Sequence, residues 1–252
     1  MSARRRMVRI GAIALALMLV ALAGFVAWAA VPAPPMAEAV AALAGDDEVV
    51  VTVDRWLVFE PASGEAQIGL VFYPGGRVDP TAYAPAMRAL AQQGVLAVIV
   101  PMPLNLAVLN PAAAREVIAA YPGVSHWAVG GHSLGGAMAA NYARRNPGVL
   151  AALVLWASYP AASDDLSASG LRALSIYGTR DGLTTLEDVT ASAARLPADT
   201  WWTPIEGGNH AQFGWYGQQA GDNPAAITRP DQQAQALEAT LRLLCTLGPC
   251  RP

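Results

Sequence analysis

The 252-residue chain contains no lysine, and all sixteen of its basic residues are arginine. The absence of lysine excludes Schiff-base catalysis, acyl enzymes of the Ser-x-x-Lys type and the lysine-dependent phosphate loop. The formal net charge is only −3 at pH 7, although Arg4, Arg5, Arg6 and Arg9 lie together at the amino terminus. The rest of the chain is therefore acidic, and nucleic acid is not an expected partner.

Cysteine is scarce as well. Cys245 and Cys250 stand in Cys-Thr-Leu-Gly-Pro-Cys at the carboxyl terminus, where Gly248 and Pro249 can turn the chain back. This spacing predicts a small terminal disulfide, which is typical of proteins in oxidising compartments. The alternative is a pair of free thiols on a frayed terminus.

An uncharged run of 22 residues, 10–31, follows the arginine cluster. A helix needs roughly 20 apolar residues to cross a bilayer, and the arginines should stay inside, which places the rest of the chain outside the cytoplasmic membrane. We interpret residues 1–31 as a transmembrane anchor, because a signal peptide has a shorter apolar core. Cleavage near Ala27-Trp28-Ala29 and secretion remain the alternative.

The residues after this run suggest a linker and then one domain. Residues 32–47 are rich in proline and alanine, and 31–35 read as a stiff spacer that lifts the domain from the membrane. Residues 48–252 are enough for one domain and too few for two.

Short apolar runs alternate with helical patterns along this domain, which predicts an α/β fold: a mostly parallel sheet with helices on both faces. A hairpin turning at 61–64 should join the first two strands. We expect strands at 49–59, 67–73, 95–100, 126–130, 151–156, 173–177 and 200–205, and helices at 80–93, 111–120, 134–145, 185–196 and 230–247.

The segment Gly-His-Ser-Leu-Gly-Gly, 131–136, contains the pattern Gly-x-Ser-x-Gly. A predicted strand ends at this segment and a predicted helix begins after it, as in a nucleophile elbow, so Ser133 is the candidate nucleophile. At Gly131 and Gly135 a side chain would collide across the sharp turn. The alternative is a plain glycine-rich turn of a nucleotide-binding fold, which is disfavoured because Gly-x-Gly-x-x-Gly is missing.

A serine hydroxyl needs a base to take its proton, and only three histidines are available. His132 lies inside the elbow and His126 begins a buried strand. His210 follows the last predicted strand in a glycine-rich loop, so it is the expected base, although it could be an ordinary exposed loop histidine.

The imidazole in turn needs a carboxylate to fix its tautomer. Asp181 follows a buried strand in Gly-Thr-Arg-Asp-Gly, at the carboxyl end of the sheet where the sites of such folds gather. Glu206, Asp188 and Asp222 are the alternatives.

Donors for an oxyanion are expected from two backbone N–H groups. Leu134 supplies one directly after the serine, and Gly76 in Tyr-Pro-Gly-Gly, 73–76, supplies the other. The alternative for the second is a Pro-Gly turn without a catalytic role.

From 67 to 244 the chain resembles the α/β-hydrolase superfamily, and within it the small lidless group similar to dienelactone hydrolases. The resemblance rests on the segments 73–83, 131–136, 178–181 and 208–210, and the order Ser133, Asp181, His210 matches that fold. Dienelactone hydrolases carry a cysteine nucleophile where Ser133 stands here, which favours ordinary carboxylic esters. Relatives with a lid insert a helical cap where this chain has only 157–172, so no large lid is expected.

The resemblance implies a serine esterase that works through an acyl enzyme on small-molecule esters, without metal or organic cofactor. The apolar segments 101–109 and 213–216 should wall the pocket, which suggests small to medium apolar substrates. The oligomeric state does not follow from the sequence. Thioesterase, acyltransferase or peptidase activity on the same triad is the alternative, and a non-catalytic membrane-tethered binding protein is a more distant one.

Overall fold

The computed structural model describes residues 3–62 and 64–251. These residues contain one sheet of eight strands in the order β1-β2-β4-β3-β5-β6-β7-β8. The strands are β1 Val49–Val53, β2 Leu57–Pro61, β3 Ile68–Tyr73, β4 Val95–Ile99, β5 His126–His132, β6 Ala152–Trp156, β7 Arg172–Gly178 and β8 Trp201–Ile205. The α-helices are α1 Ala3–Ala29, α2 Ala37–Ala41, α3 Ala84–Gln92, α4 Ala114–Ala120, α5 Leu134–Arg145, α6 Leu186–Ser192 and α7 Arg229–Leu244.

The sheet is parallel from β4 to β8, and only β1 and β2 run antiparallel to their neighbours. The predicted α/β class with a mostly parallel sheet is therefore confirmed. All six residues of β3 are buried, as expected for a central strand that is covered on both sides.

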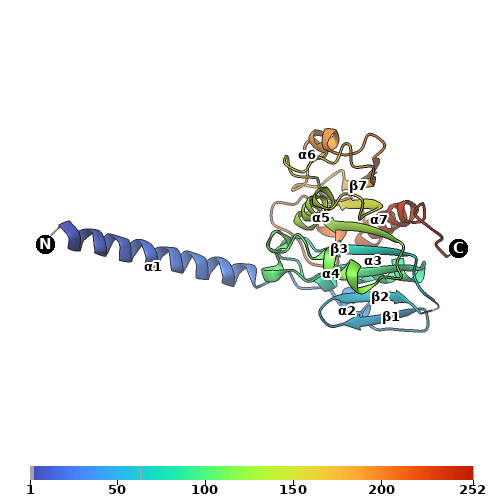
Figure 1. Cartoon of the computed structure of the whole chain (residues 1–252), viewed down its shortest axis with the longest axis horizontal. Helices are drawn as coiled ribbons and strands as arrows, with labels where there is room; N and C mark the ends of the chain where they lie inside the picture. The colour runs from blue at the N-terminus through green and yellow to red at the C-terminus, as the bar shows by residue number, and fades with distance from the viewer. Residues whose placement is uncertain (1–2, 63, 252) are drawn as a thin grey trace.

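Helices cover both faces of the sheet (Figure 1). Leu70 and Phe72 of β3 pack in one core with residues of α3 and α7, whereas Val71 and Tyr73 pack in a second core with residues of α4 and α5. Alternate side chains of a strand point to opposite faces, so one short apolar strand contributes to both cores. Parallel strands in this arrangement bring the loops at their carboxyl ends together at one edge of the sheet.

The prediction of a hairpin between the strands expected at 49–59 and 67–73 is wrong. Residues 49–59 belong to two strands, β1 and β2, which pair with each other. Val51 lies opposite Phe59, and Val53 lies opposite Leu57. The turn lies at residues 54–56, where the Asp54 N–H donates to the Trp56 carbonyl at 3.1 Å. The polar residues Asp54 and Arg55 interrupt the apolar pattern of 49–59, which by itself predicts one strand. β2 pairs with β4 instead of β3. β3 lies between β4 and β5 and is parallel to both. Ser63, within the expected turn, lies outside the described residues.

No lid covers the domain between β6 and β7. Residues 157–171 form no helix and no strand. This agrees with the short connection that the sequence has there.

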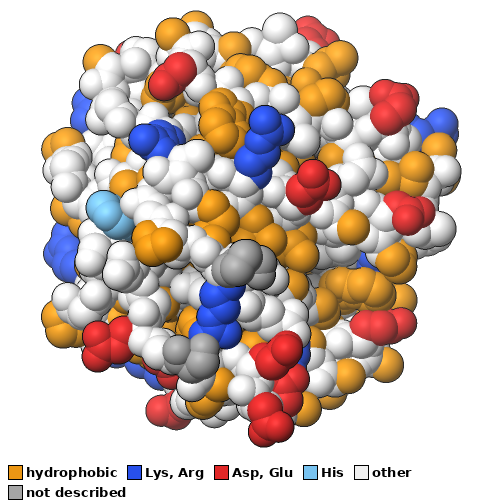
Figure 2. Space-filling model, turned by 90° about the vertical axis from the view of Figure 1, so that its right-hand side faces the viewer, with side chains coloured by type: hydrophobic (Ala, Val, Ile, Leu, Met, Phe, Trp, Pro, Cys, Tyr) orange, Lys and Arg blue, Asp and Glu red, His pale blue; other side chains and the backbone are white. Residues whose placement is uncertain are grey.

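Helix α1 projects from the domain as a single rod (Figure 1). Its segment Ile10–Ala29 has a mean hydropathy of 2.6 and is long and apolar enough to cross a membrane. The same length and composition are compatible with a signal sequence, so the helix by itself does not separate an anchor from a signal. The face of the domain opposite to α1 carries scattered acidic and basic side chains among apolar ones (Figure 2).

The interpretation of residues 31–35 as a spacer is wrong, because this segment is docked on the domain. The Ala33 N–H donates to the Arg77 carbonyl at 2.6 Å, the Asp79 N–H donates to the Ala33 carbonyl at 3.1 Å, and the Met36 N–H donates to the Trp215 carbonyl at 2.8 Å. Prolines stiffen the segment but leave its other N–H and carbonyl groups available for pairing. We call residues 28–36 the strap.

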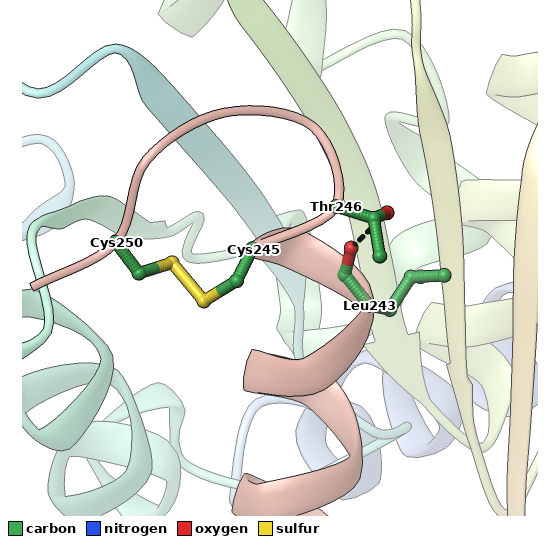
Figure 3. Close-up of a disulfide and its surroundings, with 4 residues drawn as sticks. All are labelled: Leu243, Cys245, Thr246 and Cys250. Atoms are coloured by element: carbon green, nitrogen blue, oxygen red, sulfur yellow. Dashed lines mark hydrogen bonds between the residues drawn. A yellow bond between two sulfur atoms is a disulfide. The ribbon is translucent and has the colours of Figure 1, made fainter. Parts of the chain in front are cut away.

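The carboxyl terminus is closed by the predicted disulfide between Cys245 and Cys250 (Figure 3). Their Cα atoms lie 5.3 Å apart, directly after the last turn of α7. The Thr246 hydroxyl donates to the Leu243 carbonyl at 2.6 Å and so continues the turn. The alternative of two free thiols therefore does not hold in this structure.

Candidate active site

Ser133 occupies a tight turn between β5 and α5. Its backbone angles, φ 52° and ψ −124°, are sparsely populated for a residue with a side chain. The turn is held from both sides, since the Ser133 N–H donates to the Trp156 carbonyl at 3.0 Å and the Ser158 hydroxyl donates to the Ser133 carbonyl at 2.7 Å. A strained serine between a strand and a helix is the geometry of a nucleophile elbow.

The glycines of the elbow have the steric role that the sequence suggests. A Cβ atom on Gly135 would lie 2.1 Å from the carbonyl oxygen of Tyr73 and 2.3 Å from that of Pro74. A Cβ atom on Gly131 would lie 2.5 Å from the carbonyl carbon of Gly135. These contacts are shorter than van der Waals distance, so only glycine lets the loop after β3 pack against the elbow.

Gly76 and Leu134, the predicted oxyanion donors, lie next to each other. A Cβ atom on Gly76 would be 3.2 Å from Cδ2 of Leu134. Among the described residues, no hydrogen bond engages the N–H of either residue. In contrast, the N–H of Gly75 donates to the Tyr83 hydroxyl at 3.0 Å. Two unengaged donors therefore border the same space beside Ser133.

His210 and Asp181 are brought together from the loops after β8 and β7. His210 Nδ1 lies 2.8 Å from Asp181 Oδ2, and both side chains are buried. The other carboxylate oxygen accepts the N–H groups of Leu183 at 2.8 Å and Thr184 at 2.7 Å. His210 Nε2 is buried without a hydrogen-bond partner in the described part of the chain. Among the described residues no hydrogen bond joins this nitrogen to Ser133, so it is left unpaired.

The alternative carboxylates have other partners. Asp222 accepts the backbone N–H of His210 at 3.2 Å and that of Ala211 at 2.9 Å, so it holds the histidine loop without touching the imidazole. Asp188 caps α6 in a capping box with Thr185. Glu206 is exposed in the turn after β8. Sequence reasoning missed the bracing role of Asp222, because no local pattern joins it to a loop twelve residues earlier.

His132 is the second residue that sequence reasoning underrated. It is fully buried, its ring centroid lies 4.5 Å from that of His210, and its Nδ1 lies 2.9 Å from the Tyr83 hydroxyl. The same hydroxyl accepts the Gly75 N–H, and the tautomer of His132 decides which partner donates in the Tyr83–His132 bond. One chain of contacts therefore joins the loop at Gly75 to the two histidines. Its only sequence signal was the position of His132 directly before the serine.

The surroundings of His132 favour its neutral form. Burial lowers the pKa of His132 well below the ordinary value of 6.5, and the neighbouring His210 lowers this pKa further. The backbone carbonyl of His210 acts in the opposite direction, with a smaller effect. Burial also raises the pKa of Tyr83, so its hydroxyl stays protonated and remains a donor.

A hollow of about 580 Å³ lies in front of Ser133. Leu106 and Tyr216 line it, one from each of the two expected wall segments 101–109 and 213–216. Phe213, from the second segment, is packed in the core instead. Within the described residues, no group of three or more histidine, cysteine or acidic side chains is arranged to hold a metal ion.

The strap forms part of the wall, which the sequence did not predict. Trp28, Val31, Pro32 and Ala33 all line the hollow. Reading this segment as a spacer excluded it from the site. The missing information was its docking on Arg77 and Trp215, which are far away in the sequence.

The chain matches a family model described as the alpha/beta hydrolase family over residues 69–234. No curated protein matches it. Among solved structures, it is similar to esterase 2 of Thermogutta terrifontis phosphonylated by sarin, with 18% identity over 81% of this chain and 96% of that one and a TM-score of 0.61.

The same esterase phosphorylated by paraoxon is 20% identical over 81% of this chain and 95% of that one, with a TM-score of 0.58. Its butyrate-bound form is 17% identical over 81% and 96%, with a TM-score of 0.56. At these identities the likeness is one of fold. The family model covers well over half of the chain, and it agrees with the sheet order and the elbow. The chain belongs to the alpha/beta hydrolase family.

Proposed function

We propose that this protein is a carboxylic ester hydrolase with Ser133 as nucleophile, His210 as base and Asp181 as the group that orients the base. The observation that carries the proposal is the 2.8 Å hydrogen bond between His210 Nδ1 and Asp181 Oδ2, which leaves Nε2 without a partner in the described residues. A bond at Nδ1 fixes the tautomer in which Nε2 accepts a proton. The family membership supports hydrolase chemistry.

The first half of the reaction acylates the serine. Ser133 Oγ attacks the ester carbonyl carbon while its proton passes to His210 Nε2. The tetrahedral intermediate then collapses, the bond to the alkoxy oxygen breaks, and His210 returns the proton to the departing alcohol. Asp181 stabilises the imidazolium that exists between these two steps.

The second half releases the acid. A water molecule gives a proton to His210 Nε2 and attacks the acyl carbonyl, and the proton returns to Ser133 Oγ as the ester bond to the enzyme breaks. The N–H groups of Gly76 and Leu134 receive the negative oxygen in both halves, and each such donor contributes roughly 3–4 kcal/mol. Leu134 begins the twelve-residue helix α5, whose positive end adds to this stabilisation.

The lining of the hollow supports esters with small to medium apolar groups. Val31, Leu106 and Tyr216 offer apolar surface to a bound group. Esterase 2 of Thermogutta terrifontis, which shares the fold, is described in a butyrate-bound form. A four-carbon acyl group is therefore a suitable first substrate.

The test replaces Ser133 by alanine. Ser133→Ala should lower kcat for p-nitrophenyl butyrate by about 10⁶-fold and abolish labelling by a fluorophosphonate probe, because both need the serine oxygen. The matched control is Ser125→Ala, an exposed serine that precedes β5 at the end of the strand away from Ser133. Unchanged turnover in Ser133→Ala would refute the proposal. A thioester and a peptide substrate in the same assay establish whether the ester is the preferred acyl donor.

A further inference from the structure

The last turn of α1 is fastened to the loop that carries Gly76. Arg77 Nε donates to the Trp28 carbonyl at 2.9 Å, and Arg77 Nη2 donates to the Val31 carbonyl at 2.8 Å. Asn105 Nδ2 donates to the Ala29 carbonyl at 3.0 Å, and Ala29 is fully buried. Carbonyl groups at a helix end lack partners within the helix, and a cation there is favoured by the helix dipole. The helix end is thus part of the domain.

The same helix end borders the candidate active site. Trp28 lines the hollow together with Ser133, and the Arg77 guanidinium lies 4.1 Å from the centre of the Trp28 ring. Trp28 is still 52% exposed on its other side. Tryptophan is enriched where a membrane helix meets water, because its ring is largely apolar and carries one polar N–H group.

The length of the apolar run fixes the height of the domain above the lipid. Ile10–Ala29 has 20 residues, and a helix of that length spans about 30 Å, which equals the hydrocarbon thickness of a bilayer. The run ends at Ala29, the residue that is buried in the domain. With α1 as an uncleaved anchor, no residues remain between span and domain, which places the hollow at the level of the lipid headgroups.

Exposed apolar side chains border the hollow. Trp28 and Val31 line it and are 52% and 64% exposed. Val108 and Leu109, which are 52% and 50% exposed, belong to the turn Ala107–Leu109 directly after Leu106, another lining residue. Exposed apolar groups gathered at one site are unfavourable in water and favourable against a membrane interface. Of the residues that line the hollow, Arg77 alone is charged.

We propose that the pocket at Ser133 opens onto the bilayer crossed by α1 and takes its substrates from the membrane: amphiphilic esters whose apolar chain stays among the lipids while the ester group enters. This inference rests on the proposed ester hydrolysis and names the substrate class for the same site. It also requires the uncleaved anchor, because cleavage after Ala29 removes Trp28 from the wall.

The experiment separates the domain from the bilayer without changing the wall. About ten Gly-Ser residues are inserted between Ala27 and Trp28 of the full chain, which adds a reach of about 17 Å. Residues 10–27 remain long enough to span. The control is the same insertion between Ser169 and Gly170, in an exposed loop. Each protein is reconstituted in phosphatidylcholine vesicles and assayed with water-soluble p-nitrophenyl acetate and with 4-methylumbelliferyl oleate dissolved in the bilayer.

The expected result is selective. The insertion at residue 27 should lower hydrolysis of the bilayer-bound oleate ester by about tenfold, because the entrance leaves the lipid surface. Hydrolysis of the acetate should stay within about twofold, and the control insertion should change neither rate.

Three outcomes would overturn the inference while the proposed ester hydrolysis stands: equal loss on both substrates, an unchanged rate on the oleate ester, or an intact mass showing that the mature chain begins after Ala29. If the parent protein, without any insertion, hydrolyses neither substrate, the proposed function itself is rejected.

Discussion

The two sides of the hollow at Ser133 are built in different ways. On one side, Ser133 lines the hollow from the end of a parallel strand; Asp181 and His210 follow the ends of other strands and do not line the hollow themselves, and all these strands are held by continuous backbone pairing. On the other side, the strap is held by a few backbone hydrogen bonds and by the side chains of Arg77 and Asn105. The sheet carries the proposed reactive groups, and the strap contributes part of the wall. Chemistry and access can therefore change independently.

The largest expected effect lies on the sheet side. Asp181→Asn should lower kcat for p-nitrophenyl butyrate at neutral pH by about 10⁴-fold, because an amide oriented by the Leu183 and Thr184 N–H groups no longer holds the reactive tautomer of His210. The KM value should change little. Asp188→Asn, at the cap of α6, is the matched control. Equal losses in both variants would show that the carboxylate at residue 181 has no special role.

The second prediction concerns the sheet side and the loss of its folding stability at acidic pH. Burial keeps the pKa of His132 below its ordinary value of 6.5, so the unfolded chain binds the proton first as pH falls. This contribution to stability is complete above about pH 6.5 and is lost progressively as the pH falls below it. Urea unfolding of the protein in detergent micelles at several pH values measures the loss.

His132→Asn should remove that part of the pH dependence, since asparagine does not titrate. Arg77→Met, on the strap side, should retain the same pH dependence of stability as the parent protein. If the slope between pH 6.5 and 5.5 is the same in His132→Asn as in the parent protein, another group causes the acid sensitivity.

The smallest expected effect lies on the strap side. Arg77→Met removes two side-chain hydrogen bonds to the strap and should cost about 1 kcal/mol of local stability, which raises the opening of the strap about fivefold. Hydrogen exchange at the Ala33 and Met36 N–H groups measures it. Arg55→Met, at an exposed arginine paired with Glu116, is the control. Unchanged exchange in Arg77→Met would mean that the backbone bonds alone hold the strap.

The fold and the pairing of Asp181 with His210 were accessible from the sequence because their signals are local. Each residue follows a short apolar strand, and the ends of parallel strands must meet at one edge of the sheet. Gly131 and Gly135 could be assigned a steric role for the same reason: the crowding arises within one turn. The boundaries of α5 match the predicted helix at 134–145 without change.

The features that escaped prediction depend on contacts between distant segments. The strap pairs with residues 77–79 and 215–216, and nothing in this proline-rich run of nine residues indicates where it docks. Asp222 braces the backbone of His210 through the fold of a long loop. The early hairpin was misplaced because a strand pattern gives the period of a strand but not its partner.

The disulfide between Cys245 and Cys250 can serve as a marker of the compartment that holds the carboxyl terminus. It closes a ring of only a few residues at the far end of the domain from α1, so its formation constrains the chain little and leaves the pocket untouched (Figures 1 and 3). Its redox state follows the compartment rather than the activity. Because the chain has no other cysteine, counting thiols on intact cells and after lysis reports on which side of the membrane the carboxyl terminus matured.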